Sequence, residues 1–173
     1  MARLITVVDY NPNWPQAFEQ EATLLRQALA GVLVEVHHIG STSVPGLAAK
    51  PIIDILPEVN DLALLDAKAP QMEALGYEVM GEYGIPGRRY FRKGGDQRTH
   101  HLHAFLVGDA HAIRHLAFRD YLRAHPEVAK AYGELKREVA ERSNNNIETY
   151  GDGKDPFIKI HERKALEWYA RQR

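Results

Sequence analysis

The chain has no cysteine among its 173 residues, which excludes disulfide bonds and thiolate metal sites. A chain without disulfides is compatible with a reducing compartment, and we expect it in the cytoplasm. It also lacks any apolar run near the roughly 18 residues that crossing a bilayer requires. The segment from Met1 to Val8 is too short, and becomes polar too soon, for a secretory signal. We therefore expect no membrane association.

An excess of charge of one sign is also missing. The 22 Lys and Arg residues nearly balance the 23 Asp and Glu residues, which leaves a formal net charge of -1. Such a chain has no overall field that attracts nucleic acid, so we expect no nucleic-acid partner, although a local basic pocket for one nucleotide remains compatible. With 45% hydrophobic residues, the chain predicts a single domain over residues 1–173 with its own core.

One stretch in the first third of the chain combines features that point to a binding site. Residues 32–39 are mostly apolar and β-branched, which predicts a strand that ends at Gly40. Ser41 and Thr42 follow in a turn, and the next apolar run contains Asp54. A carboxylate in a buried strand is costly unless something compensates its charge. The turn's N–H groups suit an anion, and Asp54 suits a metal ion.

The wording of this stretch, HIGSTSVPGL at residues 38–47 and KPIIDI at residues 50–55, resembles the GrpB family. That family has the fold of DNA polymerase beta-type nucleotidyltransferases and also occurs fused to some dephospho-CoA kinases. The resemblance extends over nearly the whole chain. It implies an α/β (α+β) fold, with a nucleotidyltransferase-like mixed β-sheet, helices packed on it and a C-terminal helical half.

The resemblance also implies roles for particular residues. In the superfamily, a Gly-Ser after the first strand holds nucleotide phosphates, which corresponds to Gly40 and Ser41, and acidic residues on the next strands hold divalent metal, which corresponds to Asp54. Active members usually carry two carboxylates on that strand, separated by one residue. Here the neighbours of Asp54 at that spacing are Ile52 and Leu56, both apolar. Nucleotidyl transfer therefore does not follow from the fold, and whether the chain is an enzyme stays open.

Two histidines, His101 and His103, are the other candidates for this site. Residues two apart on a strand point to the same face, so both imidazoles could meet one ion or one phosphate. By resemblance, this strand is also where the superfamily places its third metal ligand. Our hypothesis is that Asp54, His101 and His103 share one metal ion. Imidazole favours Zn²⁺ or Mn²⁺ over Mg²⁺; the alternative is a structural histidine and no metal.

The candidates for binding phosphate are the turn and three cations. The backbone amides and hydroxyls of the turn would contact phosphate oxygens, and Asp54 and Ser41 would be the catalytic pair of a transferase. For Lys50 and Arg88 the alternative is a structural ion pair with Asp54, a role that Arg89 could also fill. We expect Lys154 in a glycine-flanked loop, and Lys136 on a solvated helix face. The full set is Gly40, Ser41, Thr42, Lys50, Arg88 and Lys154.

The rest of the chain predicts a sheet followed by helices. Residues 77–107 alternate strand and turn signals and predict a meander added to the central sheet. Pro70 predicts a break in the preceding helix. Helical spacing begins after Asp109, Pro126 opens a further helix, and the last helix is expected beyond Pro156.

These features predict a protein that binds a nucleotide or phosphorylated metabolite, with or without a divalent metal, as a nucleotidyltransferase-like enzyme. Two alternatives remain open. The missing second carboxylate favours an inactive nucleotidyltransferase fold that serves as a ligand sensor or interaction module. The pair of His101 and His103 with Asp54 favours a metal-dependent hydrolase.

Overall fold

The computed structural model describes residues 6–142 and 147–172 of the chain. These residues form two compact units, each assembled from separate stretches. The sheet unit consists of Asn13–Gly40 and Ile52–Ile113, and the helical unit of Met1–Pro12, Ser41–Pro51 and Arg114–Arg173. Each unit is described by itself below.

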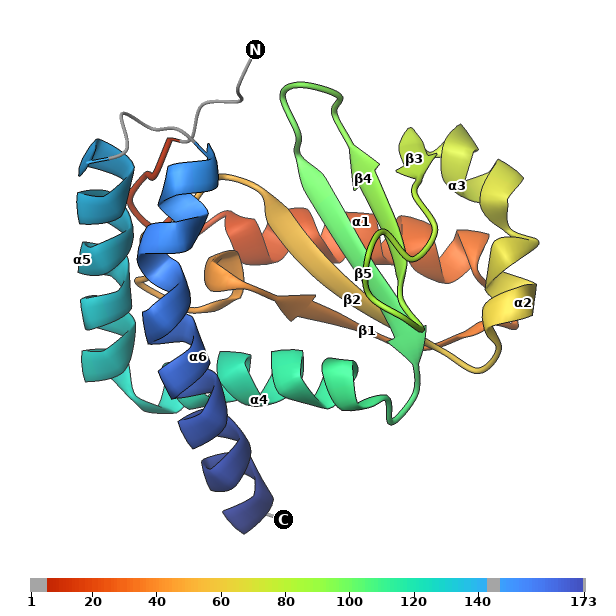
Figure 1. Ribbon diagram of the computed structural model, residues 1–173. Coiled ribbons are helices and arrows are strands. Elements are labelled where there is room, and N and C mark those ends of the chain that lie inside the picture. Colours follow the sequence, from red (N-terminus) through yellow and green to blue (C-terminus); the bar gives the residue numbers. More distant parts are fainter. Residues whose placement is uncertain (1–5, 143–146, 173) are drawn as a thin grey trace. The chain divides into compact units, whose positions relative to one another are not determined.

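The sheet unit is built on five strands, shown in Figure 1. They lie in the order β1-β2-β5-β4-β3, with β2 and β5 parallel and the other neighbours antiparallel. The predicted α/β class with a mixed sheet is confirmed, as is the predicted meander, which forms β3, β4 and β5. The strands are β1 (Leu33–Ile39), β2 (Ile53–Val59), β3 (Tyr77–Val79), β4 (Arg89–Lys93) and β5 (His100–Leu106).

Three helices complete this unit: α1 (Trp14–Ala28), α2 (Leu62–Asp66) and α3 (Ala69–Ala74). Figure 1 shows α1 passing behind the sheet, where it contacts β1 and β2. Phe18 of α1 stacks on His38 of β1, with ring centroids 4.9 Å apart. The predicted helix break near Pro70 is confirmed, because α2 ends before it and Pro70 lies in the first turn of α3, where the missing N–H costs nothing.

The two faces of the sheet differ in chemistry because side chains alternate along each strand. Residues such as Ile55 and Leu102, both fully buried, share the α1 face with His38. The opposite face carries charged and aromatic side chains from three neighbouring strands. We call this the polar face, and it consists of Asp54, Arg88, Tyr90, Arg92, His101 and His103.

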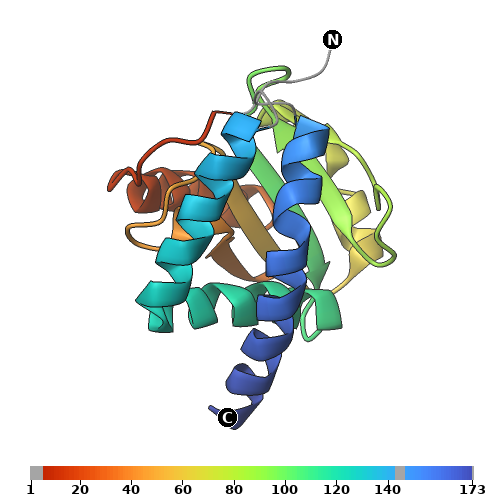
Figure 2. The same ribbon diagram turned by 60° about the vertical axis from the view of Figure 1, so that its left-hand side comes forward.

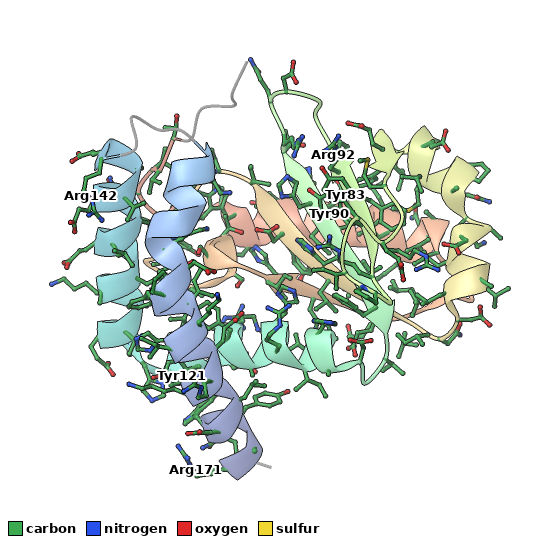
Figure 3. The ribbon with its side chains drawn as sticks, in the orientation of Figure 1. Tyr83, Tyr90, Arg92, Tyr121, Arg142 and Arg171 are labelled. Atoms are coloured by element: carbon green, nitrogen blue, oxygen red, sulfur yellow. The ribbon has the colours of Figure 1, made fainter. Side chains whose placement is uncertain are left out.

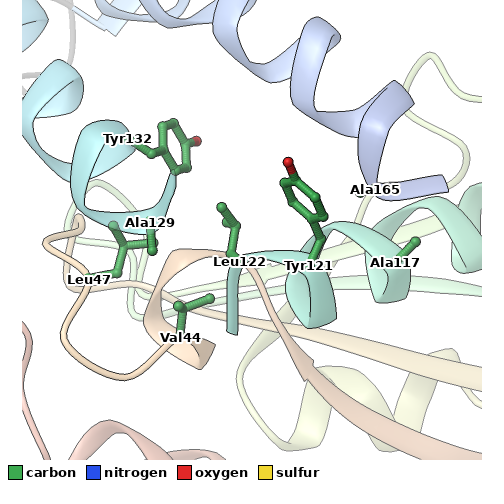
Figure 4. Packing of buried hydrophobic residues seen from close by; sticks show 8 residues of the cluster. All are labelled: Val44, Leu47, Ala117, Tyr121, Leu122, Ala129, Tyr132 and Ala165. Atoms are coloured by element: carbon green, nitrogen blue, oxygen red, sulfur yellow. The ribbon is translucent and has the colours of Figure 1, made fainter. Parts of the chain in front are cut away.

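The helical unit contains the short 3-10 helix η1 (Ser41–Ser43) and three α-helices: α4 (Ala110–Ala124), which begins in the sheet unit, α5 (Pro126–Arg142) and α6 (Ile147–Arg171). Figures 1 and 2 both show α5 and α6 side by side, in agreement with their contacts. The predicted C-terminal helical half is confirmed. Its core, in Figure 4, consists of Val44, Leu47, Ala117, Tyr121, Leu122, Ala129, Tyr132 and Ala165.

Two sequence predictions about these helices are wrong. The last helix begins at Ile147, so Pro156 and Lys154 lie inside α6 and not before it or in a loop. Packing explains why the helix continues: Phe157 stacks on Tyr132 with centroids 5.1 Å apart, and any Cβ at Gly153 would lie 2.4 Å from Val139. The intrinsic preferences of glycine and proline are outweighed by this close approach of α6 to α5.

The second error concerns Lys136, which we expected on a solvated face of its helix. Its side chain is only 2% exposed, and its Nζ lies 4.6 Å from the ring centre of Tyr132. A long apolar stem and a cation–aromatic contact let a lysine pack in a core. In the part of the chain that the structure describes, no helix combines the length and apolar character that crossing a membrane requires.

A buried ion pair joins α1 to the meander on the α1 face. Glu21 accepts hydrogen bonds from Tyr77 Oη and Lys93 Nζ, both at 2.6 Å, and lies 3.8 Å from His100 Nε2. Burial by itself would raise the pKa of Glu21, but the hydrogen bonds from Lys93 and Tyr77 hold that pKa below its usual value. This network fixes the position of α1 against β3, β4 and β5.

We predict that Glu21→Gln lowers the free energy of unfolding by roughly 3 kcal/mol at pH 7, because it leaves Lys93 partly buried without its counter-ion. Since folding lowers the pKa of Glu21, its contribution is complete above the unfolded value of 4.5 and is lost as the pH falls through the folded value. The gap between variant and parent should therefore shrink below pH 4.5 in urea titrations. Glu19→Gln, on the same helix but 63% exposed, is the control and should cost little. Equal losses in both variants would contradict the network.

Candidate functional site

The polar face brings Asp54 together with both predicted histidines. Asp54 on β2 lies directly opposite His101 on β5, and His103 follows two residues later on the same face. Both imidazoles approach one carboxylate oxygen: His103 Nε2 lies 3.2 Å and His101 Nδ1 lies 3.6 Å from Asp54 Oδ1. His100 points to the other face, toward Glu21. The alternation along β5 thus separates the three histidines into one structural residue and two that contact Asp54.

This contact determines the charge state of the carboxylate. Burial by itself would raise the pKa of Asp54, but hydrogen bonds and positive charge from His101 and His103 outweigh it and hold the pKa far below its usual value. Asp54 is therefore a stable anion inside an apolar strand. Of the cations considered from sequence as structural partners of Asp54, Arg89 pairs with Asp66 instead, with 2.7 Å between Nε and Oδ1. A pairing with Lys50 or Arg88 stays a prediction.

Arg88 supports this cluster from the loop before β4. It is 8% exposed, and it donates from Nη2 to the carbonyl of Tyr83 at 2.7 Å and from Nε to that of Glu82 at 3.1 Å. Its Nη1 lies 3.4 Å from His103 Nδ1. His103 is thus contacted at both ring nitrogens, at Nε2 by Asp54 and at Nδ1 by Arg88. The phosphate-binding role predicted for Arg88 stays a prediction.

Gly40, at the end of β1, lies directly against the carboxylate. Its φ of +73° belongs to the left-handed region, and a Cβ built on it would lie 2.8 Å from Asp54 Oδ2. A side chain at this position would have to displace the carboxylate. Glycine is therefore required both for the backbone conformation and for the approach of the chain to Asp54.

The remaining predicted residues belong to the helical unit. Ser41 and Thr42 form the start of η1, and Thr42 is buried. Lys50 follows in the same segment, and Lys154 lies in α6. The sheet unit thus assembles Gly40, Asp54, Arg88, His101 and His103, and the phosphate-binding roles predicted for the other residues stay predictions.

Two residues on the polar face have buried nitrogens without a hydrogen bond among the described residues. They are Arg92 Nε and His101 Nε2. The two residues lie directly opposite each other on β4 and β5, but their side chains extend to different neighbouring strands: Arg92 toward Glu78 on β3 and His101 toward Asp54 on β2. Glu78 Oε1 approaches Arg92 Nε to 3.4 Å, which is an ion pair without hydrogen-bond geometry at that nitrogen. Buried polar atoms are nearly always hydrogen-bonded in folded proteins, so this pair needs an explanation.

Sequence reasoning missed Arg92 as a member of this site. It lies four residues after Arg88 in the chain, and strand alternation places it on the same face of β4 as Tyr90. That alternation is the signal from which the residue could have been found.

Two tyrosines border the cluster, and sequence reasoning missed them too. The ring of Tyr90 lies 5.7 Å from that of His101 and 5.5 Å from that of His103, between centroids. Burial is the main cause that raises the pKa of Tyr90. Tyr83 stacks on Tyr90, and the guanidinium carbon of Arg92 lies 5.8 Å from the centre of the Tyr83 ring. Figure 3 shows these three side chains together on β4 and the loop before it.

The donor set does not fit a metal ion as it stands. Among the side chains that the structure describes, those of residues 6–142 and 153–172, no three His, Asp or Glu are placed to hold one. Both imidazoles approach the same oxygen of Asp54, and His103 is also contacted by Arg88. The three side chains therefore contact each other and do not surround a common point. The divalent metal stays a prediction from sequence, and no step below depends on it.

The chain matches a known family over most of its length. The GrpB family model, described as GrpB protein, matches residues 4–164, and the chain belongs to that family. It is 46% identical over 166 residues to the UPF0157 protein YqkA of Bacillus subtilis (strain 168), a match over 96% of this chain and 48% of YqkA. The chain therefore spans about half the length of that relative.

Solved structures and kinases give the wider context. The crystal structure of conserved protein GrpB from Enterococcus faecalis is 47% identical, with a TM-score of 0.91 over 95% of this chain and 99% of that one. The expected likeness to dephospho-CoA kinases is confirmed by that of Mycolicibacterium paratuberculosis, 26% identical over 95% of this chain and 46% of the kinase. Cid1 in complex with the UTP analog UMPNPP aligns at a TM-score of 0.47 and 10% identity over 76% of this chain and 42% of Cid1, too slight a likeness to build on.

We predict that Gly40→Ala destabilises the protein far more than a left-handed glycine normally would. Gly31→Ala is the matched control, because Gly31 has a φ of +85° but nothing lies within 4 Å of the place where its Cβ would be. The control should cost about 1–2 kcal/mol for its backbone conformation alone. Gly40→Ala should cost a further ~1–3 kcal/mol for the contact with Asp54. Urea denaturation measures both, and equal costs would show that Asp54 can move aside.

Proposed function

We propose that the polar face binds the phosphate group of a nucleotide or another phosphorylated metabolite. The observation that supports this most directly is the pair of buried nitrogens, Arg92 Nε and His101 Nε2, with no hydrogen bond among the described residues. An oxygen anion is a group that each of them can bind, since a guanidinium always donates and an imidazole nitrogen donates when it carries a hydrogen. A phosphate oxygen bound to either nitrogen would remove the cost of leaving that atom without a hydrogen bond.

The surroundings of the pair are consistent with a phosphate and not with a neutral ligand. Arginine combines a fixed positive charge with a planar set of donors that matches phosphate geometry. Asp54 would repel a phosphate if it were bare, but its Oδ1 is covered by His101 and His103. Its role in this proposal is to hold His101 so that Nε2 faces away from the carboxylate.

Within this proposal, we infer a nucleotidyltransferase-like enzyme as the first candidate, with Asp54 and Ser41 as its catalytic residues. Membership of the GrpB family supports it through the fold that the resemblance implies. One observation favours a second candidate, a sensor or interaction module that binds without turnover. At the spacing where an active enzyme carries its second carboxylate, this chain has Leu56, which is fully buried and cannot hold a metal.

We predict that Arg92→Gln weakens the binding of phosphorylated ligands by about 10- to 100-fold, the range expected when a hydrogen bond to a charged group is lost. Calorimetry would use the four ribonucleoside triphosphates, coenzyme A precursors and inorganic tripolyphosphate, each with chelator and with Mg²⁺, Mn²⁺ or Zn²⁺. Arg26→Gln is the matched control, because it removes the same charge from α1, on the far side of the same sheet. The Arg26→Gln variant should bind these phosphorylated ligands with the affinity of the parent.

The outcomes separate the candidates. Pyrophosphate release that Asp54→Asn abolishes would support the transferase, whereas binding without turnover would support the sensor. Metal-dependent binding that requires His103 would revive the metal site and, with hydrolysis of a phosphoester, the hydrolase. Binding of none of these ligands, or an equal loss in Arg26→Gln, would overturn the proposal.

A further inference from the structure

We propose that Tyr83 is the stacking surface for the base of a nucleoside phosphate bound at the polar face. This inference rests on the function proposed above and names the class of its ligand. It is carried by three observations on Tyr83: its exposure, the backbone that holds it, and the side chains beneath its ring.

Tyr83 is an exposed aromatic residue on a backbone that is held in an unusual conformation. Its side chain is 56% exposed, and among the described residues it is the one non-glycine residue with a positive φ, at +49°. Such a conformation costs about 1–2 kcal/mol for a residue with a side chain, and it persists only where the surroundings enforce it. A ring that remains mostly exposed regains little of this cost by burial.

The enforcement comes from the polar face itself. Arg88 donates to the carbonyl of Tyr83 at 2.7 Å, and the same guanidinium contacts His103. The loop is closed on its other side by Glu82, whose Oε2 accepts the Gly87 N–H at 2.7 Å. One buried cation therefore fixes the position of Tyr83 and contacts the histidine beside Asp54. These hydrogen bonds hold the loop in a fixed position beside the Asp54 cluster.

Two side chains contact the Tyr83 ring. The ring stacks on Tyr90 at 5.1 Å with an interplanar angle of 17°, and Arg92 lies 5.8 Å from its centre. Tyr90 and Arg92 are two residues apart on β4 and project from the same face of the sheet, and Figure 3 shows both near Tyr83. Tyr83 nevertheless stays 56% exposed, so its ring keeps area that a further planar group can cover.

The spacing suits a nucleoside phosphate. The guanidinium of Arg92 contributes the buried Nε of the proposed phosphate site and also lies beside the Tyr83 ring. The proposed phosphate and base subsites therefore share this side chain. A nucleotide joins a planar base to phosphate through a ribose, and the base can extend an aromatic stack that already contains two rings. A sugar phosphate or inorganic phosphate has no planar base and would leave the exposed part of the Tyr83 ring uncovered. Aromatic stacking discriminates between these ligands and tolerates different bases.

Calorimetry on the full chain tests this with two probes, ATP and inorganic tripolyphosphate, and with the other three ribonucleoside triphosphates to find the preferred base. ATP or another nucleotide should bind more tightly than tripolyphosphate. Tyr83→Leu should weaken the preferred nucleotide about 5- to 100-fold, the range for one base–aromatic stack, and leave tripolyphosphate unchanged. Tyr83→Phe keeps the ring and should bind like the parent.

Further variants guard against effects on folding. Tyr83→Gly removes the ring and accepts the positive φ, so it should lose nucleotide affinity while its melting temperature equals or exceeds that of the parent. Leu64→Ala, which truncates a 50%-exposed residue on α2, should change neither. If Tyr83→Leu and Tyr83→Gly bind nucleotides as the parent does, stacking is overturned, while phosphate binding that depends on Arg92 would still stand. If neither probe binds, both proposals fall.

Discussion

The contact between Asp54 and two histidines is the constraint around which the sheet unit is arranged. Asp54, a carboxylate near the start of the mostly apolar strand β2, is stabilised by His101 and His103, which lie against it. This requires β5 to lie parallel and adjacent to β2, in one register. It also requires the chain to turn at Gly40 with no side chain. The strand order, the register of β2 with β5 and the turn at the end of β1 thus all contribute to the environment of the Asp54 carboxylate.

Arg88 extends this constraint outward from the sheet. A guanidinium that satisfies two loop carbonyls and approaches an imidazole connects the conformation of residues 82–88 to the Asp54 cluster. Such shared partners make contributions non-additive, because the loss of one group changes the environment of the others. The polar face is accordingly better regarded as one network than as a set of separate binding residues.

The sequence was sufficient for the sheet, the family and the meeting of Asp54 with His101 and His103, because strand alternation and family wording are local signals. It failed where packing decides. Pro156 and Gly153 suggested a loop, but contacts with Tyr132 and Val139 continue the helix through them. Arg92 was missed although strand alternation places it on the same face as Tyr90, whereas Tyr83 was missed because no local pattern shows which meander residue will keep an exposed ring.

The order of residues in β5 has a consequence for how reliably the sheet assembles. His100, His101 and His103 could in principle exchange places if the strand slipped by one residue, since each is an imidazole. Leu102 prevents this: it is fully buried on the α1 face, and a slip would carry it to the polar face and bring a histidine into the core. The burial of Leu102 therefore disfavours a sheet in which β5 is paired one residue out of register.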